Sequence, residues 1–167
     1  MKKGFTLIEI IIYVALLAII VLAAVDIVLV SARSVSEVRV ERRIFTAGEG
    51  AMETIIRDIK QATDVIPASS TFGTSPGALA LRIPQNPGSS TIITRIFSLS
   101  FDRLQKSDDG ASEFLTPPEA KITSLIFWNL ATTTSSLVSV KMTIESGDQK
   151  NYKSRTFYGS AVLRAKY

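Results

Sequence analysis

The feature that most constrains this chain is a long uncharged run close to its start. Residues Ile10 to Val25 carry no charge, and Glu9 is the only charged residue between Phe5 and Val25. At 1.5 Å per residue, a helix over residues 5–25 is about 30 Å long, which is the thickness of a bilayer's hydrocarbon core. A buried helix of a soluble domain rarely extends this far without a polar face. The sequence therefore predicts a membrane-spanning helix.

A cleaved secretory signal is the main alternative interpretation of this run. The apolar region of such a signal is usually about 7–15 residues long and ends at a site of small residues. Ala23 and Ala24 would have to form that site, but the run is longer than usual and no proline follows before Pro67. We therefore favour a helix that is retained.

Glu9 requires an explanation, because a carboxylate costs about 2–3 kcal/mol at the centre of a bilayer. One explanation is that Glu9 lies close enough to the start of the run to reach the headgroups. The other is a cationic partner, yet no lysine or arginine of the run lies within a helical turn of it. Cleavage after Gly4 would give Phe5 a positive amino group four residues before Glu9. Opposite charges about 4 Å apart attract by roughly 4 kcal/mol at an effective dielectric constant near 20.

The segment Lys3-Gly4-Phe5-Thr6-Leu7-Ile8-Glu9 and the run after it resemble the prepilin leader of type IV pilins and type II secretion pseudopilins. This resemblance implies that a prepilin peptidase cuts between Gly4 and Phe5, and that Phe5 is then N-methylated. It also implies that Glu9 pairs with the N-terminal amine of an adjacent subunit in a filament. The partners implied are other pilin or pseudopilin subunits, an inner-membrane assembly platform, and membrane lipid before assembly.

Two further features favour a minor subunit of such a filament, in a type IV pilus, a type II secretion system or a competence system. The chain has no cysteine, whereas many pilins close a C-terminal loop with a disulfide. Three short segments are similar to minor pseudopilins of the J/W type: Thr54–Ala62, Ile122–Phe127 and Phe157–Arg164.

The resemblance implies a single pass through the inner membrane, with a cytoplasmic N-terminus and an extracytoplasmic C-terminal domain. Charge alone does not favour this orientation, because basic residues lie on both sides of the run. Two lysines precede it and four arginines follow it within 20 residues: Lys2, Lys3, Arg33, Arg39, Arg42 and Arg43. A cytoplasmic C-terminal domain is the orientation that this count would otherwise support.

Beyond the run, the hydrophobic period predicts an α+β fold, in which the N-terminal helix packs on a C-terminal antiparallel sheet. The helix is expected to continue through residues 26–64. Its apolar stripe recurs every seven positions and its other face is charged, Asp58 included. The stripe consists of Val38, Phe45, Met52 and Ile59, with Ile55 and Ala62 on the same face.

Alternating residues after the helix predict five strands. They are Ala78–Ile83, Thr91–Gln105, Ile122–Leu130, Leu137–Ser146 and Tyr152–Arg164, with a hairpin or exposed loop over Lys106–Glu113 and a tight turn at Gly147-Asp148. Arg95 and Arg103 interrupt an apolar strand face, so we expect them near its ends. The predicted division of the chain is a leader (1–4), an assembly helix (5–25), its amphipathic continuation (26–64) and a globular sheet domain (65–167).

Composition argues against an enzyme. The chain has neither histidine nor cysteine, which excludes Ser-His and Cys-His catalysis and histidine metal sites. We predict no catalytic residue, no cofactor and no metal site. The net charge of +4 includes Lys2 and Lys3 and falls to +2 without them, so direct contact with nucleic acid is not indicated.

Two clusters of charged residues offer groups that a ligand could bind. Asp108, Asp109 and Glu113 offer oxygen ligands for calcium but lack the EF-hand spacing, so a solvated turn is favoured. The four arginines after the run are more consistent with a helix face than with a phosphate site, since glutamates lie among them. The alternative function is an anchored extracytoplasmic binding domain that does not polymerise.

Overall fold

The computed structural model describes residues 6–85, 89–131, 136–148 and 151–163. Within them, one long helix precedes eight strands, with a short 3-10 helix η1 (Pro67–Ser69) between the first two strands. The long helix is α1 (Leu7–Gln61). The chain divides into two compact units, Met1–Arg39 and Val40–Tyr167, and each is described by itself.

The strands form two antiparallel sheets. The five-stranded sheet has the order β1-β2-β3-β4-β5, and the three-stranded sheet has the order β6-β7-β8. Their bounds are β1 (Asp64–Val65), β2 (Leu79–Pro84), β3 (Ile92–Ser100), β4 (Arg103–Asp108), β5 (Ala111–Phe114), β6 (Lys121–Ala131), β7 (Ser136–Ser146) and β8 (Lys153–Val162).

The first unit contains the apolar half of α1. The helix starts after Thr6, whose carbonyl oxygen accepts hydrogen bonds from the backbone N–H groups of Glu9 and Ile10 at 3.1 and 3.3 Å. Its apolar side chains, from Leu7 to Val30, are exposed. By length and composition, α1 is able to cross a membrane. A helix that is apolar on all sides needs lipid or other helices around it.

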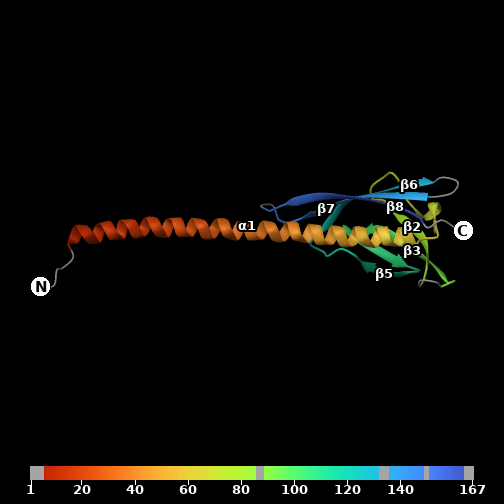
Figure 1. Ribbon diagram of the computed structural model, residues 1–167, viewed down its shortest axis with the longest axis horizontal. Coiled ribbons are helices and arrows are strands. Elements are labelled where there is room, and N and C mark those ends of the chain that lie inside the picture. The colour runs from red at the N-terminus through yellow and green to blue at the C-terminus, as the bar shows by residue number, and fades with distance from the viewer. Residues whose placement is uncertain (1–5, 86–88, 132–135, 149–150, 164–167) are drawn as a thin grey trace. The chain divides into compact units, whose positions relative to one another are not determined.

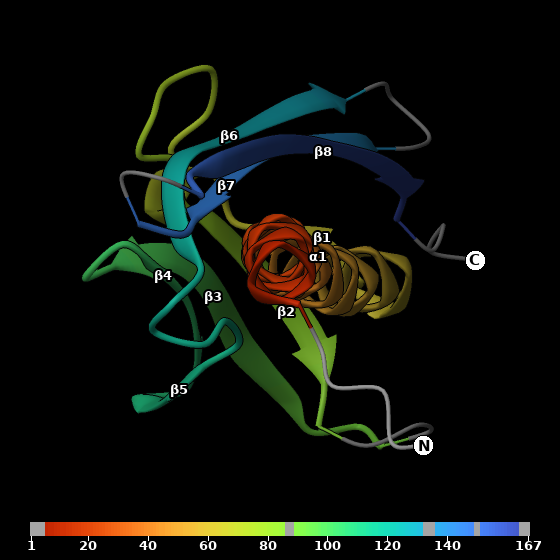
Figure 2. The same cartoon turned by 90° about the vertical axis from the view of Figure 1, so that its left-hand side faces the viewer.

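The second unit places the end of α1 between the two sheets. Figure 2 shows the three-stranded sheet arching over one side of the helix, while β2 and β3 cross its other side. In Figure 1 the strands gather around the orange and yellow part of α1. Both inner sheet faces therefore bury their apolar residues against one helix, which confirms the predicted α+β fold.

The buried stripe of α1 differs from the predicted one. Met52, Ile55, Ile59 and Ala62 are buried as expected, but Val38 is 64% exposed. A repeat of seven drifts by about 20° per heptad against the 3.6-residue turn, so the buried face rotates away from it towards the N-terminus. The stripe there consists of Val40, Ile44, Ala47, Gly48 and Ala51, and Phe45 is 39% exposed.

Strand β8 packs against α1 at two glycines. A Cβ atom added to Gly48 would lie 2.2 Å from the Phe157 ring, and one added to Gly159 would lie 2.5 Å from Cε of Met52. A side chain at position 48 would have to displace the Phe157 ring, whereas the Met52 methyl group near Gly159 is the end of a flexible side chain. The same side of β8 carries Arg155, whose guanidinium lies 5.2 Å from the centre of the Phe45 ring. Strand β8 therefore runs along α1 in the same direction.

The predicted strand Thr91–Gln105 is wrong as a single strand. It is a hairpin, in which β3 ends at Ser100, β4 starts at Arg103, and these two residues are paired. Phe101 and Asp102 form the tip, with φ values of 50° and 57°. Alternation continues on both sides of a two-residue turn, and Phe-Asp is not a recognised turn pair, so the break left no signal in the sequence.

The other turns agree better with the prediction. The hairpin expected over Lys106–Glu113 is confirmed, since Asp108 pairs with Ala111 around a turn at Asp109 and Gly110. Gly147 has a φ of 106°, which suits its predicted place at the end of β7. The connection between β7 and β8 extends from Ser146 to Lys153, so it is longer than the predicted tight turn. Helix α1 ends at Gln61 because Thr63 and Ile66 already bond to β2 through Arg82 and Ala80.

Candidate functional site

The predicted site lies at the start of the chain, and the structure describes only part of it. The predicted cleavage site at Gly4 and Phe5, and with it the predicted methylation of Phe5, lies outside the described residues. Glu9 is described. It lies in the first turn of α1, where the positive end of the helix dipole favours a carboxylate.

Most of the residues around Glu9 are apolar, with Thr6 and Tyr13 as the polar side chains one helical turn away. Exposed aliphatic side chains lie on both sides of it along α1, among them Ile8 and Ile10 at 67% and 53% exposure. After Glu9, the first basic residue along the chain is Arg33. Arg33 lies 24 positions after Glu9 along the helix, which is about 36 Å, so it is too far away to pair with Glu9.

This arrangement sets what Glu9 can do. A half-exposed carboxylate in an apolar helix surface is costly in lipid, and it is stabilised when a cation approaches the same surface. An amine at the start of a second helix of the same kind would supply that cation. A cation on a neighbouring apolar surface would therefore stabilise this carboxylate.

One comparison with known proteins bears directly on this segment. A family model described as "Prokaryotic N-terminal methylation motif" matches residues 1–25. The chain starts with a prepilin-type methylation motif. The motif covers Gly4, Phe5 and Glu9, and it ends where the uncharged run ends. It supports a type IV pilin-like precursor with a leader and a transmembrane helix. No curated protein and no solved structure matches the chain.

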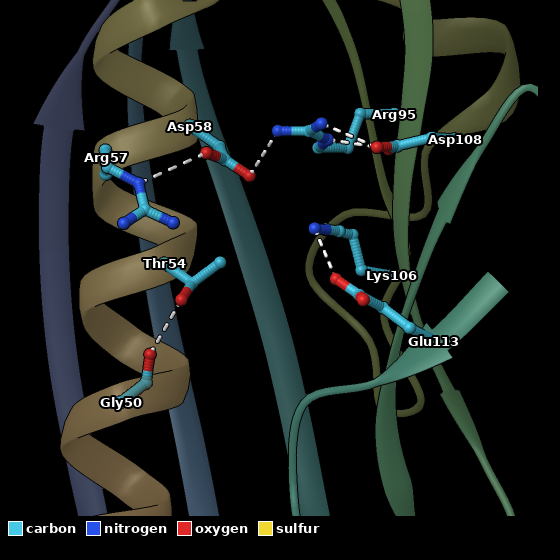
Figure 3. A network of polar contacts seen from close by, with 8 residues as sticks. All are labelled: Gly50, Thr54, Arg57, Asp58, Arg95, Lys106, Asp108 and Glu113. Atoms are coloured by element: carbon cyan, nitrogen blue, oxygen red, sulfur yellow. Dashed lines mark hydrogen bonds and ion pairs between the residues drawn. The ribbon is translucent and has the colours of Figure 1, made fainter. Parts of the chain in front are cut away.

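The second unit holds a charged network that the sequence did not predict (Figure 3). Asp58 of α1 is buried, at 2% exposure, and its Oδ2 accepts a hydrogen bond of 2.9 Å from Nη1 of Arg95 on β3. The same guanidinium donates two hydrogen bonds of 2.6 Å to Asp108 on β4. A weaker pair, of 3.7 Å, joins Asp58 to the exposed Arg57.

The charges in this network support one another. The hydrogen bonds from Arg95 hold the pKa of Asp108 below its ordinary value, although partial burial opposes this. The pKa of Arg95 is raised, mainly by its hydrogen bonds to Asp108 and also by Asp58, so the guanidinium stays charged. Because the network joins the helix to the five-stranded sheet, we interpret it as a structural connection.

The acidic hairpin considered for calcium is engaged in other contacts. Asp108 binds Arg95, an Oδ1 atom of Asp109 accepts a hydrogen bond from the Thr94 N–H at 3.0 Å, and Glu113 pairs with Lys106 at 2.5 Å. Among the described residues, no group of three or more acidic, histidine or cysteine side chains is arranged to hold a metal ion. These carboxylates therefore serve the hairpin itself.

Two expectations about charged residues were wrong. Asp58 was expected on the solvated face of α1, but it lies between Ile55 and Ile59 on the buried face, and this spacing was the available signal. Arg95 was expected near the end of a strand, but it lies inside β3 opposite Asp108. Arg103 does lie at the start of β4, where its Nε donates to the Thr116 carbonyl at 2.8 Å.

Proposed function

We propose that this chain is a structural subunit of an extracytoplasmic filament, most simply a minor pilin or pseudopilin of the J/W type. A prepilin peptidase cuts it after Gly4, Phe5 is methylated, and α1 then packs among the helices of other subunits. An inner-membrane platform assembles the filament, and the N-terminus starts on the cytoplasmic side. No catalysis is part of this role.

The observation that carries the proposal is the match of the methylation motif to residues 1–25. Two properties of the chain support it. The first unit exposes apolar side chains all along α1, and such a helix can pack in a bundle of identical surfaces. The carboxylate of Glu9, which has no lysine or arginine of the run within reach, would then neutralise the amine of a neighbour.

Assembly is favoured because Glu9 is more stable in the helix bundle than in lipid. In lipid, Glu9 carries a desolvation cost of up to about 2–3 kcal/mol. In the bundle, that cost is offset by attraction to a neighbour's amine, since water is scarce there. The pair therefore favours the assembled state over the free membrane state, and it sets the axial position of one helix against the next.

Intact-mass analysis of protein extracted from the membrane tests the processing step. We expect the loss of Met1–Gly4 and the gain of one methyl group on Phe5. The alternative, an anchored domain that does not polymerise, predicts neither change. An unprocessed mass in a cell that contains a prepilin peptidase would contradict the proposal.

The substitution Glu9→Ala tests the assembly step. We expect membrane insertion to remain normal, because an apolar residue is favoured in the run, while recovery of the subunit in purified filaments falls sharply. Glu49→Ala is the matched control, since Glu49 is an exposed carboxylate on the same helix in the second unit. Equal recovery of the Glu9 variant and the control would show that Glu9 is not an assembly residue.

A further inference from the structure

Phe101 is an outlier in the second unit. Its side chain is 90% exposed, more than any other large apolar side chain among the described residues. It also has a φ of 50°, a left-handed conformation that is unfavourable for a bulky residue. Asn-Gly is the preferred pair for a two-residue turn with positive φ at both positions. Folding alone therefore favours a different residue at this tip.

The outer face of the three-stranded sheet has exposed apolar residues near one end. The register places Leu130, Leu137 and Val162 side by side across its strands, and Trp128 precedes Leu130 by two residues on the same face. Leu130 is 60% exposed, Val162 is 52% exposed and Trp128 is 38% exposed. We call this surface the apolar end face. One row further along, Lys141 lies next to Tyr158, with its Nζ atom 5.9 Å from the centre of that ring.

The tip and the apolar end face lie at opposite ends of the second unit. The Asp102 carbonyl accepts a hydrogen bond of 2.7 Å from the N–H of Ile122, near the start of β6. Leu130 lies near the other end of β6. Eight residues of extended strand separate Ile122 from Leu130, so on the order of 25–30 Å lies between the two features.

The two features are complementary in charge as well as in polarity. Asp102 is exposed beside Phe101 at the tip. Lys141 borders the apolar end face and is partly exposed. An apolar side chain with a carboxylate next to it thus fits an apolar surface with an ammonium group at its edge.

We propose that Phe101 of one copy packs on the apolar end face of a second copy, with Asp102 paired to Lys141. Because donor and acceptor surfaces differ and lie at opposite ends, the contact is head-to-tail and not a closed two-fold pair. Where copies of this chain are neighbours in the filament, the contact arranges them in a row. The inference rests on the proposed filament, since a single aromatic contact is weak until the α1 helices hold the copies at a high effective concentration.

Cysteine cross-linking in the full chain tests this contact, because the natural sequence contains no cysteine. Ser100→Cys and Ser160→Cys introduce thiols beside the tip and on the row of Trp128, and both leave the proposed contact residues intact. Mild oxidation of cells that assemble the filament should give a ladder of multimers. Two differently tagged copies with one cysteine each should give only a dimer.

The matched control joins Ser100→Cys to Ser112→Cys, since Ser112 is exposed on the five-stranded sheet, away from the apolar end face. We expect no ladder from it. Adding Phe101→Ser to the first pair should reduce its cross-linking about tenfold or more, because the buried aromatic surface is lost. Cross-linking no higher than the control, or cross-linking to a different protein, would overturn the inference.

A charge exchange provides a second measurement that a folding defect does not imitate. Asp102→Lys and Lys141→Asp should each lower the cross-linking yield, and the two together should restore it. Processing at Gly4 and dependence on Glu9 are measured in the same cells. If these persist while the exchange has no effect, the inference fails and the proposed function stands.

The thermal stability of a variant at the tip shows whether Phe101 serves the contact between copies or the fold of the hairpin. Replacing the tip by Phe101→Asn with Asp102→Gly supplies the preferred turn pair, so the thermal midpoint of unfolding should rise by about 2–4 °C. The same change should abolish the ladder. A lower midpoint would show that Phe101 serves the fold of the hairpin, and would overturn the inference.

Discussion

At the scale of single residues, the most consequential side chain of the second unit is Asp58. Its carboxylate is buried, it makes one short contact with Arg95, and it makes one long contact with the exposed Arg57. Removing one partner of a buried pair leaves the other charge uncompensated, whereas an exposed pair contributes little. The contact with Arg95 therefore contributes much more to stability than the contact with Arg57.

This difference predicts the effect of two substitutions. Asp58→Ala should lower the free energy of unfolding by about 3 kcal/mol, the low end of the range for a broken buried pair, because Arg95 keeps Asp108. Arg57→Ala should cost less than about 1 kcal/mol. Urea unfolding of the full chain in detergent measures both. Equal effects would mean that the buried contact has no special weight.

The network also predicts a dependence on pH. The hydrogen bonds from Arg95 lower the pKa of Asp108 below 3.8, so the unfolded chain binds a proton before the folded one does. The stability that Asp108 contributes is complete above 3.8 and is lost as the pH falls through the lowered pKa. The difference in thermal midpoint between the natural chain and Asp108→Asn should therefore shrink on acidification. A difference that grows at low pH would contradict this.

Sequence reasoning identified Glu9 and failed at Asp58 and Arg95 for one reason. An acid inside a long uncharged run has no common explanation, so it draws attention. An acid in an amphipathic helix, and an arginine in a strand, have an easy explanation as surface residues. Their burial follows from the ion pair that they form with each other, 37 positions apart in the sequence. The local hydrophobic patterns of the helix and of the strand contain no sign of this pair.

At the scale of elements, helix α1 combines two different surfaces in one helical segment of the sequence. Its first half is exposed and its second half supplies the buried stripe of the second unit. The sequence predicted this combination because both periods are long and regular. The predicted buried face of α1 was displaced from the observed one, because a seven-residue repeat drifts against the 3.6-residue helical turn. The β3–β4 hairpin was missed because apolar and polar residues alternate on both sides of the Phe101–Asp102 turn.

Two glycines only two positions apart in α1 give a prediction for this element. Nothing lies within 4 Å of a Cβ atom added to Gly50, so Gly50→Ala should stabilise the helix by about 1 kcal/mol. A Cβ atom at Gly48 overlaps the Phe157 ring, so Gly48→Ala should be destabilising, with an overpacking cost of about 1–3 kcal/mol.

Thermal unfolding of the two variants in detergent checks this pair, with Gly50→Ala serving as the control for helix propensity. Adding Phe157→Leu should relieve much of the cost of Gly48→Ala, since the two positions are in contact and their effects are not additive. A stabilising Gly48→Ala would show that β8 does not approach α1 as closely as described.

At the scale of the whole molecule, the core of the second unit depends on the helix. Residues of α1 from Val40 to Ile59 lie in the same buried cluster as strands of both sheets. The predicted division placed the globular domain at 65–167, and that boundary remains a prediction. A sheet domain without the helix would expose both of its inner faces to water.

Two fragments test where the independently folding unit begins. A fragment starting at Val40 should unfold in one cooperative transition, because it retains the complete cluster. A fragment starting at Asp64 should show no such transition. Circular dichroism during thermal unfolding distinguishes them. Cooperative folding of the shorter fragment would mean that the sheets pack on each other without α1.

The place of α1 between two sheets has a mechanical consequence. A pull along the helix axis loads its contacts with both sheets in shear, so many contacts along the buried stripe must yield together. The short contacts of Arg95 with Asp58 and Asp108 lie across this direction and tie the helix to the five-stranded sheet near its C-terminal end. Two sheets held on a helix in this way resist separation from it far better than a domain attached by a peptide linker.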